Sequence, residues 1–164
     1  MPPDGGLRDR LIHESLFNAI QTALADLGWF DAGRQHIPIT MIDEFPDENA
    51  DVAFNTLAFS MGDSGGVPTE MGNTAEDHEI VFFIDFFAED DAIGRHLRGD
   101  IYNYLTANQI QPVFDYSQAL DPQVFTVEIQ EDIDKRKPDR AVQKWQKHWY
   151  VISFSVIDYG RVPV

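Results

Sequence analysis

The stretch Ile80-Val81-Phe82-Phe83-Ile84-Asp85-Phe86-Phe87 is apolar at every position except Asp85, and it limits the kind of sheet that this chain can form. A strand with one solvated face alternates apolar and polar side chains, whereas this one is apolar on both faces. We therefore predict a central strand over residues 78–87, with both of its faces covered. Helices are expected on one face, and the other face is covered either by the chain's own loop or by a second copy of the chain.

Two segments with helical periodicity flank this strand in the sequence. In residues 7–27 the apolar positions recur every three or four residues, and Gly28 follows where a left-handed residue would end a helix. Residues 88–108 repeat apolar side chains at the same spacing and open with Glu89, Asp90 and Asp91, acids that suit a helix N-terminus. The sequence thus supplies two helices, enough to cover one face of a sheet.

Four further segments predict the remaining strands. They alternate apolar and polar residues, or are rich in aromatic and β-branched residues, near positions 37–43, 52–61, 123–131 and 147–159. Residues 62–76 contain four glycines and are expected to form a long mobile loop, while Pro112, Asp115 and the charged residues 132–146 are expected in connectors. The order αβββαββ predicts an α+β fold, with a mixed or antiparallel sheet of about five strands and two helices on one face.

Length and composition describe one acidic domain. The chain has 164 residues, with 12 Lys and Arg against 28 Asp and Glu, for a net charge of −16. We expect a flexible arm at residues 1–6, a single domain at 7–160 and a short tail at 161–164. A broad nucleic-acid-binding face is not expected, because phosphate affinity comes mainly from Lys and Arg. The absence of cysteine excludes disulfides and cysteine nucleophiles, and neither a signal peptide nor a membrane span is predicted.

Three features with possible chemistry are each better explained as structural. Residues 62–66, Gly-Asp-Ser-Gly-Gly, match the segment around the nucleophilic serine of trypsin-like proteases, but too little chain precedes Ser64 to hold the rest of that site. The five histidines include no pair at metal-ligand spacing. Asp85 and Asp158 would form an acid/base pair if their strands brought them together, although paired or interface-facing acids are the simpler interpretation. No catalytic residue, cofactor or metal site is therefore predicted.

The basic residues are unevenly distributed along the chain. Half of them fall within thirteen positions that contain one acid, Asp139, so this segment carries +5 and the rest of the chain −21. The basic segment consists of Lys135, Arg136, Lys137, Arg140, Lys144 and Lys147. We interpret it as a docking surface for an acidic partner or for a second copy. A solvated loop and a small nucleic-acid contact are the alternatives.

The layout of the chain resembles that of the tail terminator proteins of long-tailed bacteriophages, the lambda-type family. The resemblance covers residues 7–160. It rests on the size, the first helix with its Gly28 stop, the glycine-rich insertion 62–76, the second helix after residues 80–87 and the closing strand 149–158. It is a similarity of layout, so no functional residues are carried over.

This resemblance implies a structural virion protein that is not an enzyme. Members of the family form a ring, typically hexameric, that caps the tail tube, stops its polymerisation and joins it to the head. The implied partners are other copies, the tail tube protein and a head-tail connector or stopper protein, with assembly in the host cytoplasm and no membrane contact. DNA would pass through the lumen without specific binding, which strong negative charge suits because like charges repel.

Two other functions stay open at this point. One is another neck component, such as a head-completion or stopper protein, which shares the size and the ring-forming habit. The other is a small hydrolase or ligand-binding domain that uses Asp85, Asp158 or Ser64.

Three groups of residues are expected to contact other copies or partners. They are Phe83, Asp85 and Phe87 of the two-sided strand, Gly65, Gly66 and Val67 of the glycine-rich segment, and Lys135, Arg136, Lys137, Arg140 and Lys144 of the basic segment. The strand expected over residues 38–43 offers a further edge to which a copy could add, although Pro38 would limit the pairing.

Overall fold

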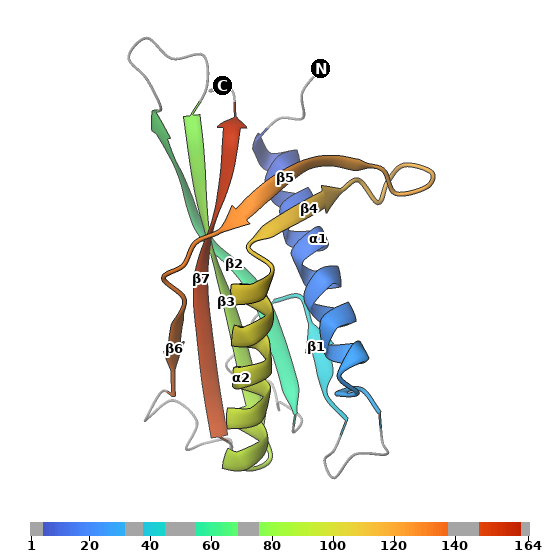
Figure 1. The fold of residues 1–164 in the computed structure, drawn as a ribbon, viewed down its shortest axis with the longest axis vertical. Helices are drawn as coiled ribbons and strands as arrows, with labels where there is room; N and C mark the ends of the chain where they lie inside the picture. The colour runs from blue at the N-terminus through green and yellow to red at the C-terminus, as the bar shows by residue number, and fades with distance from the viewer. Residues whose placement is uncertain (1–4, 32–37, 45–54, 69–75, 138–147, 162–164) are drawn as a thin grey trace.

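The computed structural model describes residues 5–31, 38–44, 55–68, 76–137 and 148–161, which form one sheet and two helices (Figure 1). The helices are α1 (Gly5–Asp26) and α2 (Asp91–Ala107). The strands are β1 (Thr40–Ile42), β2 (Thr56–Pro68), β3 (Glu76–Ala88), β4 (Ile110–Phe114), β5 (Gln123–Ile129), β6 (Asp134–Arg136) and β7 (His148–Arg161). The predicted α+β class is confirmed, with seven strands in the sheet where about five were expected.

The sheet is built around two long antiparallel strands, β3 and β7. Its order is β1-β2-β3-β7-β5-β4, with β6 paired to β7 on the same side as β5. Among the described strands, only the pairing of β1 with β2 is parallel. The apolar stretch 80–87 lies in β3 between β2 and β7, so the predicted central strand is confirmed. Figure 1 shows β4 and β5 turning away from β7 and crossing α1.

Both helices lie close to their predicted positions. Gly28, with φ of 80°, ends α1, and the N–H of Trp29 donates to the carbonyl of Leu24 at 3.0 Å. Asp90 caps α2, since its carboxylate accepts a hydrogen bond from the N–H of Ile93 at 2.8 Å. Neither helix, as described, is long and apolar enough to span a membrane.

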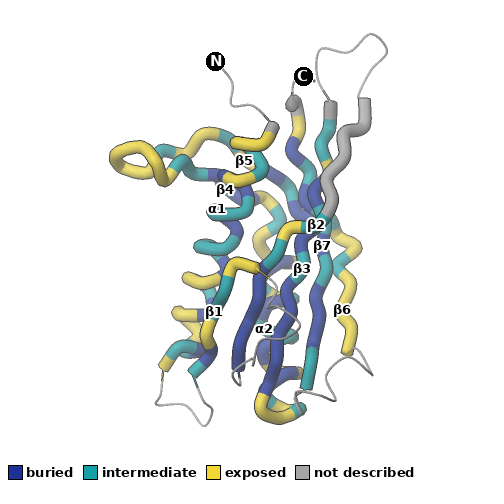
Figure 2. The backbone as a smooth tube through the Cα atoms, turned by 180° about the vertical axis from the view of Figure 1, so that it is seen from behind, coloured by how far each residue is buried: buried dark blue, intermediate teal, exposed yellow. Residues whose placement is uncertain are grey.

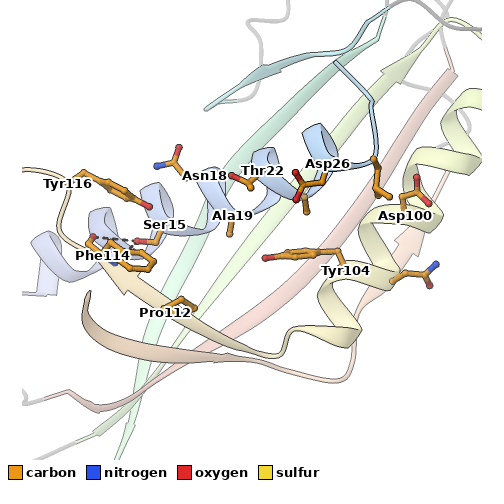
Figure 3. A pocket seen from close by; sticks show the side chains of 13 residues that line it. Ser15, Asn18, Ala19, Thr22, Asp26, Asp100, Tyr104, Pro112, Phe114 and Tyr116 are labelled. Atoms are coloured by element: carbon orange, nitrogen blue, oxygen red, sulfur yellow. Dashed lines mark hydrogen bonds between the residues drawn. The ribbon is translucent and has the colours of Figure 1, made fainter. Parts of the chain in front are cut away.

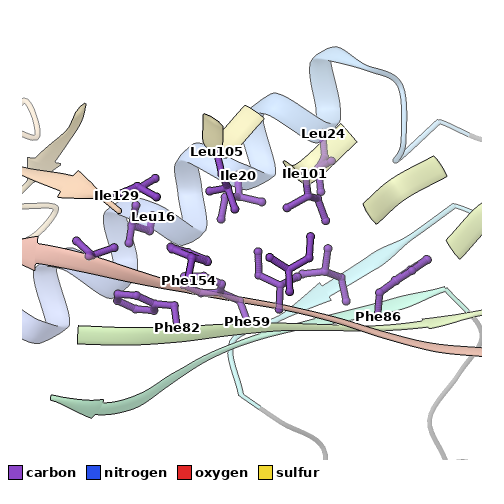
Figure 4. Close-up of a cluster of buried hydrophobic side chains, with 14 of the residues drawn as sticks. Leu16, Ile20, Leu24, Phe59, Phe82, Phe86, Ile101, Leu105, Ile129 and Phe154 are labelled. Carbon is purple, nitrogen blue, oxygen red and sulfur yellow. The ribbon is translucent and has the colours of Figure 1, made fainter. Parts of the chain in front are cut away.

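The main core lies between the helices and one face of the sheet (Figure 4). Three stacked phenylalanine rings come from neighbouring strands, with centroids 5.3 Å apart for Phe59 and Phe82 and 5.6 Å apart for Phe82 and Phe154. The helices cover them with Leu16, Ile20, Leu24, Ile101 and Leu105. Burying each such side chain contributes about 1.5–3 kcal/mol, so this layer holds the helices on the sheet.

The opposite face of β3 is buried within a single chain over residues 85–87. Asp85 is 5% exposed and Phe87 0%, and Val151 beside them on β7 is 5% exposed. Trp149 stacks on Phe87 at 5.9 Å between ring centroids and donates from Nε1 to Asp85 at 2.8 Å. A second copy is therefore not needed to cover this part of the strand. Phe83, farther along the same face, remains only half-buried.

Residues 62–68 form the second half of β2, so the prediction of a mobile loop was wrong for them. After a shift in register between Met61 and Ser64, residues 64–68 pair with β3 in antiparallel orientation. Glycine fits this strand because a β-carbon on Gly62 would lie 2.7 Å from Cε2 of Phe83, and its absence lets the phenylalanine ring approach the backbone. The rest of the predicted loop, residues 69–75, lies outside the described residues.

Two strands were missed by the sequence prediction. β4 contains Pro112 and was expected in a connector, but it is the last strand of the sheet, where proline is tolerated because one side needs no donor. β6 consists of three exposed charged residues without apolar alternation, so the sequence pattern does not predict a strand there. Only its pairing defines it, with Lys135 opposite Ile152 of β7.

Two glycines of α2 give a matched test of how the helix packs. A β-carbon on Gly94 would lie 2.0 Å from Cε2 of Tyr150, whereas one on Gly99 would meet nothing within 4 Å. We predict that Gly94→Ala displaces the Tyr150 ring and lowers the free energy of unfolding by about 1–3 kcal/mol. Gly99→Ala should raise it by up to about 1 kcal/mol, because alanine is the better helix former. Urea denaturation measures both, and equal effects would contradict this packing.

Candidate functional site

Large apolar side chains are exposed together on the arm, which we define as residues 110–129 and which comprises β4, β5 and the turn between them. Leu120 is 100% exposed, Ile110 63%, Val124 41% and Tyr116 37%. The turn stands away from the rest of the molecule in both views of the backbone (Figures 1 and 2). These exposures make the arm the candidate contact surface of the chain.

The tip of the arm has an unfavourable backbone conformation. Leu120 has φ of 68° and Asp121 has φ of 43°, in the left-handed region that side chains other than glycine enter at a cost. The turn is ordered by the carboxylate of Asp115, which accepts hydrogen bonds from the N–H of Ser117 at 3.0 Å and the side-chain amide of Gln118 at 2.7 Å. Within the described part of the chain, packing does not account for a leucine at position 120.

A buried ion pair fixes the base of the arm. The guanidinium of Arg8 donates to both carboxylate oxygens of Asp158, at 2.7 and 2.8 Å, and lies 3.7 Å from the ring centroid of Phe125 on the arm. Asp158 is fully buried, so removing its partner would cost about 3–5 kcal/mol. Ser15 adds a second link, because its Oγ accepts from the N–H of Phe114 at 2.9 Å. The arm is thus attached to both α1 and β7.

A groove of about 720 Å³ lies between α1, α2 and β4 (Figure 3). Small, aromatic and acidic side chains line it, among them Ala19, Ala23, Asp26, Asp100, Tyr104 and Phe114. Asp100 accepts a hydrogen bond from Nε1 of Trp29 at 2.8 Å and lies 3.5 Å from Nε2 of His96. Ser15 is bound to the backbone of β4. Among the described residues that line the groove, no nucleophile is hydrogen-bonded to a general base.

The described residues include no group of three or more His, Cys, Asp or Glu side chains that could hold a metal ion. Two of the histidines have aromatic neighbours instead. His13 stacks on Phe59 with ring centroids 5.1 Å apart, and His96 meets Trp29 edge to face at 5.0 Å. These two histidines therefore contribute to packing.

Ser64, Asp85 and Asp158 do not form a common site. Ser64 lies in β2, opposite Ile80 of β3. Asp85 lies on the face of the sheet away from the helices, whereas Asp158 shares the helix-covered face of β7 with the core residues and is paired with Arg8. Two acids on opposite faces cannot exchange a proton, so the acid/base pair is excluded. The interpretation of Asp158 as a paired acid agrees with its ion pair.

Lys137, one of the expected contact residues, is held within the chain. Its Nζ donates to Oδ1 of Asp91 at 2.6 Å, which also accepts from the hydroxyl of Tyr150, while Arg95 lies 2.7 Å from Oδ2. The hydrogen bond from Lys137, followed by that from Tyr150, lowers the pKa of Asp91 to about 2. Lys137 therefore joins the end of β6 to α2, and reversing its charge would disturb the fold itself.

The other basic contact residues are only partly described. Lys135 and Arg136 are exposed on β6, with Nζ of Lys135 3.9 Å from the ring centroid of Tyr102 and Nε of Arg136 2.9 Å from Asp134. Arg140, Lys144 and Lys147 lie outside the described residues. Exposed pairs of this kind stabilise a fold by at most about 1 kcal/mol, so Lys135 and Arg136 remain available to a partner.

The remaining contact residues differ in what they offer a partner. The side chains of Asp85 and Phe87 are buried, so only Phe83 of the two-sided strand has area to contribute. Gly65, Gly66 and Val67 lie in the half of β2 that β1 does not reach, because β1 pairs with residues 56–58. Their backbone is part of an edge of the sheet as described. The sequence pattern does not predict the exposed arm, because Pro112 favours a connector where β4 begins it.

No protein-family model matches this chain, and no curated protein matches its sequence.

Asp85 is a carboxyl group in a largely apolar setting. Burial raises its pKa from 3.8 to about 6, opposed by the hydrogen bond from Trp149 and by the positive charge of Arg136. Between these two pKa values the folded chain binds a proton at Asp85 that the unfolded chain does not. The contribution of Asp85 to stability is therefore fully present below pH 3.8, falls as the pH rises to about 6, and is lost above it.

Asp85→Asn removes this titration and keeps an oxygen that accepts from Trp149. We predict that the variant is more stable than the parent by roughly 3 kcal/mol at neutral pH, and that the difference shrinks to zero near pH 4. Urea denaturation of both proteins across this range measures the effect. A difference that does not change with pH, or a variant that is less stable at neutral pH, would contradict the account of Asp85.

Proposed function

We propose that this chain is a structural subunit of a bacteriophage tail, a tail terminator that assembles into a ring, expected to be a hexamer. The ring caps the tail tube, stops its polymerisation and joins it to the head, so the chain acts in the virion and not as an enzyme. Its partners are other copies, the tail tube protein and the connector or stopper protein of the neck. The proposal rests on the layout that resembles the lambda-type family and on surfaces suited to contact.

Leu120 is the observation that carries this proposal. Its side chain is fully exposed and its backbone is in the left-handed region, so leucine at this position does not stabilise the isolated subunit. Burying one leucine against a partner contributes about 1.5–3 kcal/mol, more than the backbone cost. The arm that presents it is fixed at its base by the Arg8–Asp158 ion pair. An anchored arm with an apolar tip supports a role in assembly.

The charge of the chain also supports the proposal. A net charge of −16 repels DNA, which suits a lumen through which DNA slides without being bound. A hydrolase has less support, because Ser64, Asp85 and Asp158 lie apart and, in the groove, Ser15 is bound to the backbone of β4 and Asp100 to Trp29. The arm and the charge are equally compatible with a head-completion or stopper protein. Binding of the ring to tail tubes distinguishes the tail terminator from that alternative.

Native mass spectrometry and electron microscopy of the purified protein, alone and with the tail tube protein of its phage, test the proposal. We expect a single ring species and tubes that carry a ring at one end and stop growing. A protein that stays monomeric at all concentrations would contradict the proposal. A ring that binds the head connector but leaves tube growth unchanged would instead identify a neck component.

Leu120→Asn tests the role assigned to the arm. We expect the free energy of unfolding to rise by up to about 1 kcal/mol, because asparagine tolerates a left-handed backbone, while ring formation or tube binding weakens. Asp121→Asn is the matched control, since it changes a neighbouring left-handed residue without removing an apolar side chain. Unfolding curves and native mass spectrometry give the two readouts. If Leu120→Asn assembles and binds tubes like the parent, the arm is not part of the contact.

A further inference from the structure

The part of the sheet beside α2 ends in two short strands on opposite sides. Among the described strands, β1 pairs with β2 alone and β6 with β7 alone, while β2, β3 and β7 lie between them. Figure 2 shows β1 and β6 on opposite sides of the molecule, and β6 is exposed at all three residues. The outer backbone groups of an edge strand are able to pair with a strand of another chain. This part of the sheet thus has two different edges, the β1 edge and the β6 edge.

The β1 edge is acidic. Asp43 and Glu44 follow β1 and are exposed, and Asp9 and Glu14 lie nearby on α1. Arg10 is the basic residue in this group, and its Nε lies 3.7 Å from Glu14. Two open hollows of about 310 and 430 Å³ run between α1 and the strands here, and their apolar lining consists of Phe17, Met41, Ile42 and Met61. The β1 edge therefore combines negative charge with apolar recesses.

The β6 edge is basic, although the chain as a whole is strongly acidic. Its five basic side chains are Lys135, Arg136 and Lys137 at β6, and Arg95 and Arg98 on the adjacent helix α2. Four acids lie among them: Asp91 and Asp134, each paired with a basic residue, and the exposed Glu131 and Asp132 just before β6. The five basic residues and four acids give a balance of +1, so this edge is slightly positive, whereas the four acids and one Arg of the β1 edge give −3.

We propose that the β6 edge of one copy binds the β1 edge of the next, and this inference rests on the ring proposed above. The two surfaces have opposite charge, lie on opposite sides of one sheet and differ from each other, which makes the contact head-to-tail and allows it to close a ring by repetition. Lys135 and Arg136 of one copy face Asp43 and Glu44 of its neighbour. The partner of the basic edge is thus a second copy of this chain.

Two charge-reversed variants test this pairing. Asp43→Lys/Glu44→Lys makes both edges basic, and Lys135→Glu/Arg136→Glu makes both edges acidic. Lys137 is left unchanged because it is bonded to Asp91 of α2. Each variant alone should lose about tenfold or more in the association constant of each contact. Mixed in equal amounts, the two should form rings again in which the variants alternate, since each altered edge then meets its complement. Native mass spectrometry resolves the composition, because the variants differ in mass.

Asp26→Lys/Glu79→Lys is the control for net charge, since it makes the same change in charge as Asp43→Lys/Glu44→Lys at exposed positions outside both edges. It should assemble like the parent, and far-UV circular dichroism should show all variants folded. If a reversed variant is unfolded, Asp43→Asn/Glu44→Gln and Lys135→Gln/Arg136→Gln replace the pair, with weaker assembly expected for each. Assembly of the parent should weaken as salt rises, because the charges are exposed.

The outcomes separate this inference from the proposed function. If the parent forms rings and each reversed variant forms them equally well at low salt, the edge pairing is wrong, whereas the proposed ring is unaffected. The pairing is also wrong if mixing the variants restores nothing. If the parent binds duplex DNA, and Lys135→Glu/Arg136→Glu loses that binding but still forms rings, the β6 edge binds DNA and not a second copy. A parent that never assembles overturns both the ring and the pairing.

Discussion

The pairing of β3 with β2 on one side and β7 on the other is the constraint on which the rest of the structure depends. Because residues 80–87 are apolar on both faces, β3 is stable only in the middle of a sheet whose two faces are covered. The helices cover one face and the Phe59–Phe82–Phe154 stack fills the space beneath them. Once the centre is filled in this way, the exposed parts of the described chain include the β1 edge, the β6 edge and the arm.

The sequence predicts the features that depend on apolar periodicity and misses those that depend on partners far along the chain. The central strand, both helices, Gly28 and the Asp90 cap follow from local patterns. β6 has no such pattern, because its three charged residues become a strand only through pairing with β7. The glycines after Met61 favour a loop on composition alone, whereas pairing with β3 makes residues 64–68 a strand and Gly62 leaves room for the ring of Phe83.

The same distinction applies to the contact surfaces. The uneven distribution of basic residues is visible in the sequence, but the position of β6 opposite the acidic β1 edge is set by the sheet order. Burial of Asp85 and Phe87 removes two of the expected contact residues, while the exposed Leu120 at the tip of the arm is a proposed contact that periodicity does not identify. A subunit with two unlike edges and an apolar arm is suited to repeated head-to-tail contacts, which is the property that the proposed ring requires.

Because the chain contains no cysteine, site-specific crosslinking tests this account most directly. In a Glu44→Cys/Arg136→Cys protein, the two thiols of one subunit lie on opposite edges, so a short bismaleimide can join them only between copies. The account predicts a ladder of covalent multimers that ends at the size of the closed ring, and no ladder for either single cysteine variant. A ring-forming double variant that yields only uncrosslinked subunits would contradict the head-to-tail contact between β6 and β1.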